Sequence, residues 1–549
     1  MNQKRLEKYI LLISAVLLLW GIFFTPEQII LRSEEPRRAV IAMEMIFSGD
    51  YLKPQMHGWP YYNKPPIFNW ILVVFMKIFG SFDEWVVRLP GQASLVATAF
   101  AVYALFKQSL GKYIALAAAF FLLTGGEVLF YGLTIAGQID LFFMLIVFLH
   151  IGFLHRGIVS QNQWQWMLLS YLFLSIGVLT KGLPSVAFHV LTLAAWGIYY
   201  HSFRILWHWT HVFGAFVALC MIAGYFLLYH LDGGNAWTYI VNLFKEASSK
   251  SGLEASASKV FFNAVNFPFS FLKIMLPWSL LMVALWHRQC RTRFFRGSVD
   301  IQLILLFLAL NVLPYWFAGH LSLRYLYPFL PFMAIVLAYL ADEHGRCSGN
   351  IGFFHFFIFG LICLTPLGFT AMPIVLNEID IDYYEAKLAF IWMLSIGLGL
   401  VWWRFKTLRI AASILLMAQL KLAANWVYYP IRYADEQHYS LEMEVNHFFE
   451  LTDGAPVMLF GQPERLPRDA SIGPLTLQEV VIMAPMPISY QHPYYIEKRQ
   501  GEIMQFHSKM QPETYYLARE SDVNEEAVEI FYGFIDDWQR RPLVLCKMR

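Results

Sequence analysis

Long apolar runs separated by short polar connections dominate the first 430 residues of the chain. Because about 20 apolar residues cross a bilayer as a helix, each run of this kind predicts a membrane-spanning helix. The pattern therefore predicts an all-α polytopic membrane protein with about thirteen transmembrane helices. We expect them at residues 9–24, 88–106, 113–130, 138–154, 166–180, 183–200, 211–229, 262–286, 301–317, 323–341, 351–375, 387–403 and 409–428.

The first apolar run, residues 9–24, follows basic residues at positions 4, 5 and 8 and so resembles the start of a signal peptide. The sequence that comes next, Thr25-Pro-Glu-Gln, offers no small-x-small cleavage site. We therefore expect an uncleaved first membrane helix whose N-terminus lies in the cytoplasm.

Basic residues in the short connections test this arrangement, because Lys and Arg are retained on the cytoplasmic side. If the spans are as predicted, the basic connections lie on the same side of the membrane as the N-terminus. Because the number of crossings is odd, the C-terminal part then lies outside the cytoplasm. The sequence thus predicts a multi-pass membrane protein with an extracytoplasmic C-terminal domain. The residues concerned are Lys107, Lys112, His155, Arg156, Arg204, Arg288, Arg291, Arg293, Arg296, Arg346, Arg404, Lys406 and Arg409.

Two outer segments, 25–87 and 230–261, are too long to be simple connections, and long structured loops often carry function. From Ala434 the composition becomes polar, with helical patterns at 441–451 and 525–534. Strand-like runs occur at 457–460, 515–518 and 543–545. We therefore predict a transmembrane domain over 1–430, which includes the periplasmic loop 25–87, and a small α/β domain over 434–549.

Composition agrees with a membrane protein, since 58% of the residues are hydrophobic and 15% are charged. A formal charge of +2 gives no reason to expect a nucleic-acid partner. The five cysteines are too few and scattered for a disulfide scaffold. Cys546 is the one that lies in the polar C-terminal part.

A set of ionisable residues is expected near the outer membrane surface, although it is spread over nearly three hundred positions. Removing such groups from water is costly unless they are paired or hydrated, so they mark candidate functional sites. Two carboxylates and several cations at one water–lipid boundary would suit a phosphate-bearing lipid and a reaction that needs a base. The set consists of Glu34, Glu35, Arg37, Arg38, Lys64, Asp140, Lys181, His320 and Arg324.

The two adjacent carboxylates, Glu34 and Glu35, precede an amphipathic pattern in which Pro36 suits the first helical turn and Gly49 the end. The positive end of a helix dipole favours ionised carboxylates, as a base requires. The alternative is that both residues only cap the helix. Taken singly, the other members of the set also have ordinary structural explanations.

Two cations are candidates for binding phosphate. Lys64 lies in Tyr61-Tyr-Asn-Lys-Pro-Pro, where the prolines hold the chain extended before an apolar helix. Arg324 lies in Leu323-Arg-Tyr-Leu-Tyr-Pro, and a guanidinium binds phosphate oxygens in bidentate fashion. A lysine that only extends its ammonium group from the lipid to the water is the alternative for Lys64.

The sequence resembles the GT-C membrane glycosyltransferases, and within them the protein-mannosyltransferase and aminoarabinose (lipid A) transferase branch, families 39 and 83. The resemblance covers residues 1–430 and rests on Glu34-Glu35-Pro-Arg, Tyr62-Asn-Lys-Pro, Asp140 and Thr180-Lys-Gly. It implies a GT-C fold and transfer of a sugar from a polyprenyl-phosphate donor, with inversion. The acceptor would be a lipid A-like glycolipid, a glycan or a protein outside the cytoplasmic membrane.

The resemblance also implies roles for particular residues. Glu34 corresponds to the catalytic Asp of the family and Glu35 to its second acid. Lys64 and Lys181 correspond to lysines that would bind the donor phosphate, and Tyr325 to the Tyr of a late periplasmic motif. Beside these, the residues themselves favour Arg324 as a phosphate ligand.

Arg37, Asp140 and His320 are the expected substrate-binding residues. If the acceptor is a hydroxyl, Glu34 would be its general base. If the acceptor is an ionised phosphate, Glu34 would only orient it or the sugar.

Three positions depart from the family pattern. Glu34 is one methylene longer than Asp, Asn63 replaces a Glu before the Lys, and Ala247 falls where some members carry a His. The sequence contains no nucleotide-binding motif. No cofactor is therefore identified, a divalent metal remains an alternative, and Lys64, Lys181 and Arg324 are expected to replace a metal.

A transporter or lipid flippase is the chief rival, because it too places charges among many helices. Transporters gather them near the midplane on repeated, broken helices, whereas this sequence has no repeat and places them at one face. A structural protein of an envelope complex is a second rival. Sugar transfer by Glu34 and Lys64 variants would separate these classes.

Overall fold

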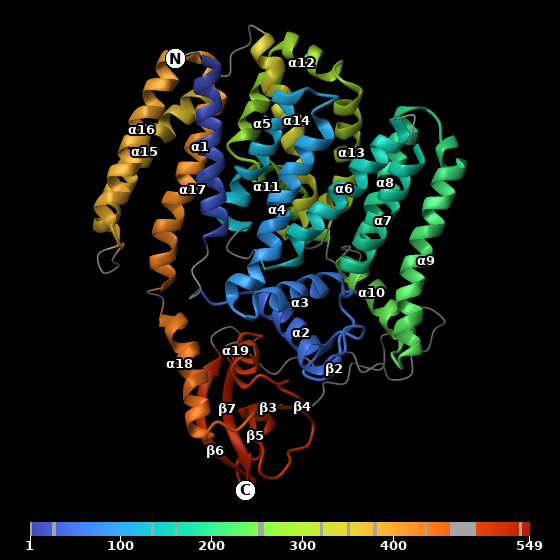
Figure 1. Ribbon diagram of the computed structural model, residues 1–549, viewed down its shortest axis with the longest axis vertical. Helices are drawn as coiled ribbons and strands as arrows, with labels where there is room; N and C mark the ends of the chain where they lie inside the picture. Colours follow the sequence, from blue (N-terminus) through green and yellow to red (C-terminus); the bar gives the residue numbers. More distant parts are fainter. Residues whose placement is uncertain are drawn as a thin grey trace. The chain divides into compact units, whose positions relative to one another are not determined.

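The computed structural model describes residues 3–549 except 25–28, 133–136, 160–162, 251–256, 319–321, 348–351, 377–380, 434–435, 462–489 and 537–540. Over these residues, nine helical segments are long and apolar enough to cross a membrane (Figure 1). They contain α1 (Gln3–Phe23), α4 (Glu84–Phe106), α6 (Ile139–Val159), α9 (Trp209–Leu231), α13 (Val299–Trp316), α14 (Leu330–Arg346), α15 (Gly352–Val375), α16 (Tyr384–Arg404) and α17 (Arg409–Tyr433).

The polytopic helical fold is confirmed, with fewer qualifying spans than the thirteen expected. The apolar helices α5 (Lys112–Leu123) and α8 (Leu183–Tyr199) are short, and α7 (Gln163–Lys181) begins with polar residues. The run at 262–286 breaks into α11 (Ala257–Lys273) and η3 (Trp278–Trp286), with a bend of 106°. Pro277 lies at this break and has no backbone N–H to continue a helix. Counting the bent pair as one span gives ten.

The chain forms two compact units. The membrane unit consists of residues 1–26, 91–222 and 245–432, and the loop–sheet unit of residues 27–90, 223–244 and 433–549. The described part of the expected outer loop, residues 29–87, belongs to the same unit as the C-terminal part of the chain, whereas the sequence grouped it with the transmembrane domain. Each unit is described by itself below.

One large apolar core, contributed by most of its helices, holds the membrane unit together. In it the rings of Phe121 and Trp278 stack with their centroids 3.8 Å apart. Polar side chains inside this core bond to backbone carbonyls: Lys421 Nζ donates to the Leu129 oxygen at 2.8 Å. Such bonds satisfy groups that lipid cannot hydrate. The remaining helices of this unit are η1 (Glu127–Gly132), η2 (Arg204–Trp207), α12 (Arg288–Phe295), η4 (Leu323–Phe329) and η5 (Lys406–Leu408).

The loop part of the loop–sheet unit contains α2 (Glu35–Ser48), strands β1 (Gln55–Met56) and β2 (Trp59–Pro60), and α3 (Ile67–Phe79). Helix α10 (Ala236–Lys250) begins in this unit. Pro36 lies in the first turn of α2, and Gly49 ends the helix with φ 74°, as the sequence predicts. His57 and Gly58 join β1 to β2 with φ values of 57° and 74°. Positive φ at both positions is the geometry of a two-residue hairpin turn.

The C-terminal part is a five-stranded sheet with strand order β4-β3-β5-β7-β6. Strand β3 pairs parallel with β4 and β5, and β7 pairs antiparallel with β5 and β6. Helices α18 and α19 lie beside this sheet in Figure 1. Their bounds, with those of the strands, are α18 (Glu436–Leu451), β3 (Val457–Phe460), α19 (Gln491–Gln500), β4 (Phe506–His507), β5 (Tyr515–Arg519), η6 (Glu520–Asp522), β6 (Val528–Asp536) and β7 (Arg541–Met548).

The α/β character of the C-terminal part is confirmed, and its expected strands at 457–460, 515–518 and 543–545 are present. The helical expectation for 525–534 was wrong, because this segment contributes β6. Its Val, Ile, Phe and Tyr residues favour a strand, and β7 supplies backbone partners from Val528 to Asp536. Of the glutamates that suggested a helix, Glu525 and Glu526 precede the strand and Glu529 lies in it.

Candidate functional site

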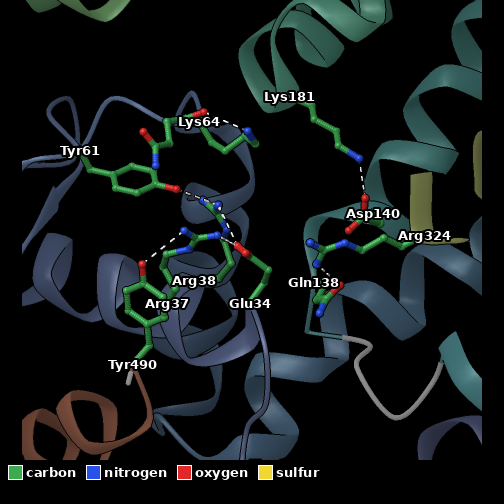
Figure 2. Close-up of polar contacts among 11 residues, drawn as sticks. Glu34, Arg37, Arg38, Tyr61, Lys64, Gln138, Asp140, Lys181, Arg324 and Tyr490 are labelled. Atoms are coloured by element: carbon green, nitrogen blue, oxygen red, sulfur yellow. Dashed lines mark hydrogen bonds and ion pairs between the residues drawn. The ribbon is translucent and has the colours of Figure 1, made fainter. Parts of the chain in front are cut away.

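Glu34 occupies the position immediately before α2 in the loop–sheet unit, and its side chain is 27% exposed. Its carboxylate pairs with Arg37, one turn later, and lies 3.7 Å from Arg38 Nη2 (Figure 2). Residues three and four positions apart on a helix lie on one face, so the start of α2 brings these charges together. The result is a partly exposed carboxylate beside two guanidinium groups.

Two tyrosines hold these guanidinium groups. Arg38 is 2% exposed, donates to the Tyr61 hydroxyl at 2.9 Å and lies 5.4 Å from the centre of that ring. Arg37 donates to the Tyr490 hydroxyl at 3.4 Å and lies 5.1 Å from its ring centre. These contacts fix the orientation of the cations around Glu34.

Several N–H groups of the two arginines remain without a partner. Among the described residues, Arg38 Nε and Nη1 and Arg37 Nε are buried and make no hydrogen bond. A buried guanidinium donor without an acceptor is costly to a folded protein. These groups could therefore donate hydrogen bonds to an oxygen-rich ligand, such as a phosphate or a sugar.

Glu35 lies in a different environment from Glu34. It is 0% exposed, and Arg88 on α4 binds its two oxygens through Nε at 3.1 Å and Nη2 at 3.3 Å. The Arg32 backbone N–H also donates to Glu35 at 3.0 Å. A carboxylate enclosed in this way is not available to accept a proton from a substrate. The sequence expected Glu35 to be catalytic, but its contacts point to a structural role.

Lys64 is half-buried, and its Nζ donates to the Asn63 carbonyl at 3.1 Å. The Lys64 carbonyl in turn accepts a hydrogen bond from the Tyr239 hydroxyl at 2.6 Å. Pro65 and Pro66 follow directly, before α3 begins. The segment 223–244 thus holds the backbone of Lys64 within the loop–sheet unit.

A second cluster lies in the membrane unit, where Lys181 at the end of α7 forms a close ion pair with Asp140 at the start of α6 (Figure 2). Arg324 on η4 donates to the Gln138 side chain at 3.0 Å. Lys181 and Arg324 lie 5.2 and 5.5 Å from the ring centre of Tyr325. This unit therefore brings Asp140, Lys181, Arg324 and Tyr325 together, and their roles in substrate binding stay a prediction.

This second cluster also has donors without acceptors. Arg324 Nε and Gln138 Nε2 are buried and make no hydrogen bond among the described residues. Among the residues named in this cluster, Lys181 and Arg324 are cations and Asp140 is the carboxylate, a balance that favours an anion. Gln138 was not anticipated, and its place two residues before Asp140 was the only signal. His320 lies outside the described residues.

The candidate residues thus divide between the two units. Glu34, Glu35, Arg37, Arg38 and Lys64 belong to the loop–sheet unit, whereas Asp140, Lys181, Arg324 and Tyr325 belong to the membrane unit. Sequence reasoning missed Tyr61, Tyr490 and Arg88, because tertiary contacts alone connect them with α2. A single cavity that joins both clusters stays a prediction.

Comparisons with known proteins bear on this arrangement. The profile of the dolichyl-phosphate-mannose-protein mannosyltransferase family matches residues 63–227. Two curated relatives are undecaprenyl phosphate-alpha-4-amino-4-deoxy-L-arabinose arabinosyl transferases. The one from Edwardsiella ictaluri is 25% identical over 190 residues and the one from Erwinia tasmaniensis 27% over 207 residues. These matches span 34% and 36% of this chain and equal shares of the relatives' lengths.

The solved structures extend the likeness along the chain. Crystal structures of ArnT from Cupriavidus metallidurans, one bound to undecaprenyl phosphate and one in the apo state, align with TM-scores of 0.67 and 0.66. Each alignment covers 98% of both chains at 16% identity, which establishes a shared fold. The chain therefore has the GT-C fold and resembles the GT-C membrane glycosyltransferases of the protein-mannosyltransferase and aminoarabinose-transferase type.

Proposed function

We propose that this protein transfers a sugar from a polyprenyl-phosphate donor to an acceptor at the outer face of the bacterial cytoplasmic membrane. The observation that carries the proposal is the set of buried guanidinium N–H groups, on Arg37 and Arg38 beside Glu34 and on Arg324, that make no hydrogen bond within the described part of the chain. Such donors match the phosphate and hydroxyl oxygens of a lipid-linked sugar. The N-terminus would be cytoplasmic, and the loop–sheet unit would face the periplasm.

In the proposed reaction, an acceptor oxygen attacks the anomeric carbon, and the bond between that carbon and the phosphate oxygen breaks. Attack on the side opposite the leaving group inverts the anomeric configuration. The polyprenyl phosphate leaves with the negative charge, so the transition state needs cations at the leaving oxygens and an oriented acceptor. A hydroxyl acceptor also loses its proton.

We assign Glu34 the acceptor side of this reaction. It is the partly exposed carboxylate of the pair, and Arg37 and Arg38 fix its position. It would take the proton of a hydroxyl acceptor as general base or orient an acceptor that is already ionised. Arg37 would contact the substrate, and Glu35 would hold the start of α2 in place through Arg88.

The donor phosphate is assigned to Arg324, Lys181 and Tyr325, with Lys64 as a further cation. Arg324 has an unpaired buried Nε, and Lys181 is oriented by its ion pair with Asp140. Arg324 and Lys181 would together neutralise the charge of the donor phosphate, a role that a metal ion has in soluble glycosyltransferases. Undecaprenyl phosphate in the similarly folded ArnT structure supports this class of donor.

Replacing Arg324 by Gln should weaken donor binding more than turnover. The donor phosphate is already charged when it binds, so a ligand of its non-bridging oxygens acts in both the ground and transition states, and its loss raises KM more than it lowers kcat. A charge-assisted hydrogen bond contributes about 1.5–3 kcal/mol, which corresponds to an increase in donor KM of about 10- to 100-fold. Steady-state kinetics with varied donor measure this. Arg293→Gln, at an exposed arginine on α12, is the control, and an unchanged donor KM would remove Arg324 from the phosphate site.

Lys64→Ala should also raise the donor KM, as Arg324→Gln does. Its side chain is half-buried and its backbone is fixed by Tyr239, so the substitution removes a positioned cation without moving the loop. Titrating donor against the purified variant gives the apparent affinity. A variant whose kcat falls while its donor KM stays constant would place Lys64 outside the phosphate site.

Mass spectrometry of envelope lipids and proteins tests the function itself. Cells without the gene should lack one glycosylated species, and wild-type protein should restore it whereas Glu34→Gln should not. The mass difference identifies the sugar and the acceptor. Identical envelope profiles with and without the gene, under conditions in which the protein is produced, would contradict the proposal.

A further inference from the structure

A buried group of metal-ligating side chains lies in the loop–sheet unit away from the start of α2. From its geometry we propose that Glu44, His57 and Glu497 form a binding site for a divalent metal ion of the zinc type. The site would join α2, the turn between β1 and β2, and α19. It is independent of the proposed sugar transfer and has a structural purpose.

The three side chains have the spacing of a metal site. One potential ligand atom from each residue lies within 4.8 Å of the others. His57 Nδ1 is 3.9 Å from Glu44 Oε1 and 3.7 Å from Glu497 Oε1. The glutamates are 0% exposed and His57 is 2% exposed. Imidazole and carboxylate together form a typical zinc ligand set.

Backbone groups orient the carboxylates, as in known metal sites. The N–H groups of His57 and Gly58 donate to the two oxygens of Glu44, the latter at 3.1 Å. The Met504 N–H donates to Glu497 Oε1 at 3.1 Å. Both carboxylates are therefore held in position before any metal arrives.

The remaining atoms indicate a cation. Among the described residues, Glu497 Oε2 is buried and accepts no hydrogen bond. Within the same residues, no Lys or Arg forms an ion pair with Glu44 or Glu497. His57 Nδ1 also lies 3.0 Å from the Met504 carbonyl oxygen. As an N–H donor it bonds this oxygen alone. If Nδ1 instead carries no proton, its lone pair can bind a cation together with one oxygen each from Glu44, Glu497 and the Met504 carbonyl, which gives four ligands.

A shared proton is the competing occupant. Burial raises the pKa of Glu44 to about 7 and raises the pKa of Glu497 above its usual range. Two adjacent buried carboxylates cannot both stay ionised unless a cation lies between them.

Metal analysis of the full-length protein separates these occupants. The protein is purified with a streptavidin-binding tag, reconstituted with Zn²⁺, freed of loosely bound metal and analysed by elemental mass spectrometry. We expect about one zinc per chain for the wild type, and less than about one tenth for Glu497→Gln, because each ligand of a small site is essential. Zinc should also raise the thermal unfolding midpoint of the wild type and leave that of Glu497→Gln unchanged.

A matched control is available in the same unit. Glu444 on α18 lies 3.2 Å from His492 Nε2 and belongs to no group of metal-ligating side chains among the described residues, so Glu444→Gln should retain the zinc. Wild-type protein that binds no stoichiometric zinc would overturn the proposal in favour of the shared proton. Equal zinc in wild type and Glu497→Gln would overturn it too.

X-ray absorption spectroscopy at the zinc edge identifies the zinc ligands in the wild-type protein, so this test does not depend on whether a variant folds. It should reveal one imidazole and oxygen ligands in the zinc-loaded wild type. Sulfur ligands or several imidazoles would overturn the assignment.

Discussion

Glu34→Gln should lower kcat by about 10²- to 10⁴-fold if the acceptor is a hydroxyl, because the amide cannot take its proton. Glutamine has the same shape, so binding of the donor should change little. The loss is therefore expected in kcat, with donor KM nearly constant. Turnover by purified protein in lipid vesicles, with donor and acceptor varied separately, measures both constants.

Two further variants interpret this result. Glu34→Asp keeps a carboxylate and matches the residue of the similar family, so it should recover a substantial part of the activity. Asp232→Asn, at an exposed acid that pairs with Lys53 in the same unit, should behave like wild type. Glu34→Gln turnover within a few-fold of wild type would exclude Glu34 as the base.

Arg88→Met should be among the most destabilising single substitutions in the loop–sheet unit. It leaves the Glu35 carboxylate, which is 0% exposed, buried without its cation. Removing one partner of a buried ion pair costs about 3–5 kcal/mol of folding free energy. The midpoint of unfolding of the purified protein should therefore fall clearly below that of wild type.

The double variant Arg88→Met/Glu35→Gln separates structure from catalysis. Removing the second charge should recover part of the lost stability, because no uncompensated ion stays buried. Glu35→Gln alone should lower the unfolding midpoint as well as the activity. If Glu35→Gln abolished turnover while stability stayed at the wild-type value, Glu35 would be a catalytic residue after all.

Local patterns predicted the parts of the fold that depend on local chemistry. Pro36 and Gly49 delimit α2 because one suits a first helical turn and the other a left-handed end. Apolar runs located the membrane helices because lipid requires them. The helix predicted for 525–534 was wrong, because the pairing of β6 with β7 outweighs the local helical preference of the glutamates in this segment.

The site depends on contacts that no local pattern contains. Glu34 and Glu35 are neighbours, yet one is partly exposed and the other is enclosed by Arg88, which is 53 positions away. Arg37 meets Tyr490 across 453 positions. Adjacent carboxylates in a sequence are equivalent until packing separates them, so their roles could be distinguished only in three dimensions.

The most direct test follows a labelled donor in a defined system. Purified wild-type protein in vesicles is given undecaprenyl phosphate carrying, in radiolabelled form, the sugar that the envelope mass difference identifies, together with an envelope extract as the acceptor. We predict that label moves to the acceptor and that undecaprenyl phosphate is released in equal amount, and that a hydroxyl acceptor receives label far more slowly from Glu34→Gln. Intact donor that instead crosses the bilayer would identify a transporter and contradict sugar transfer.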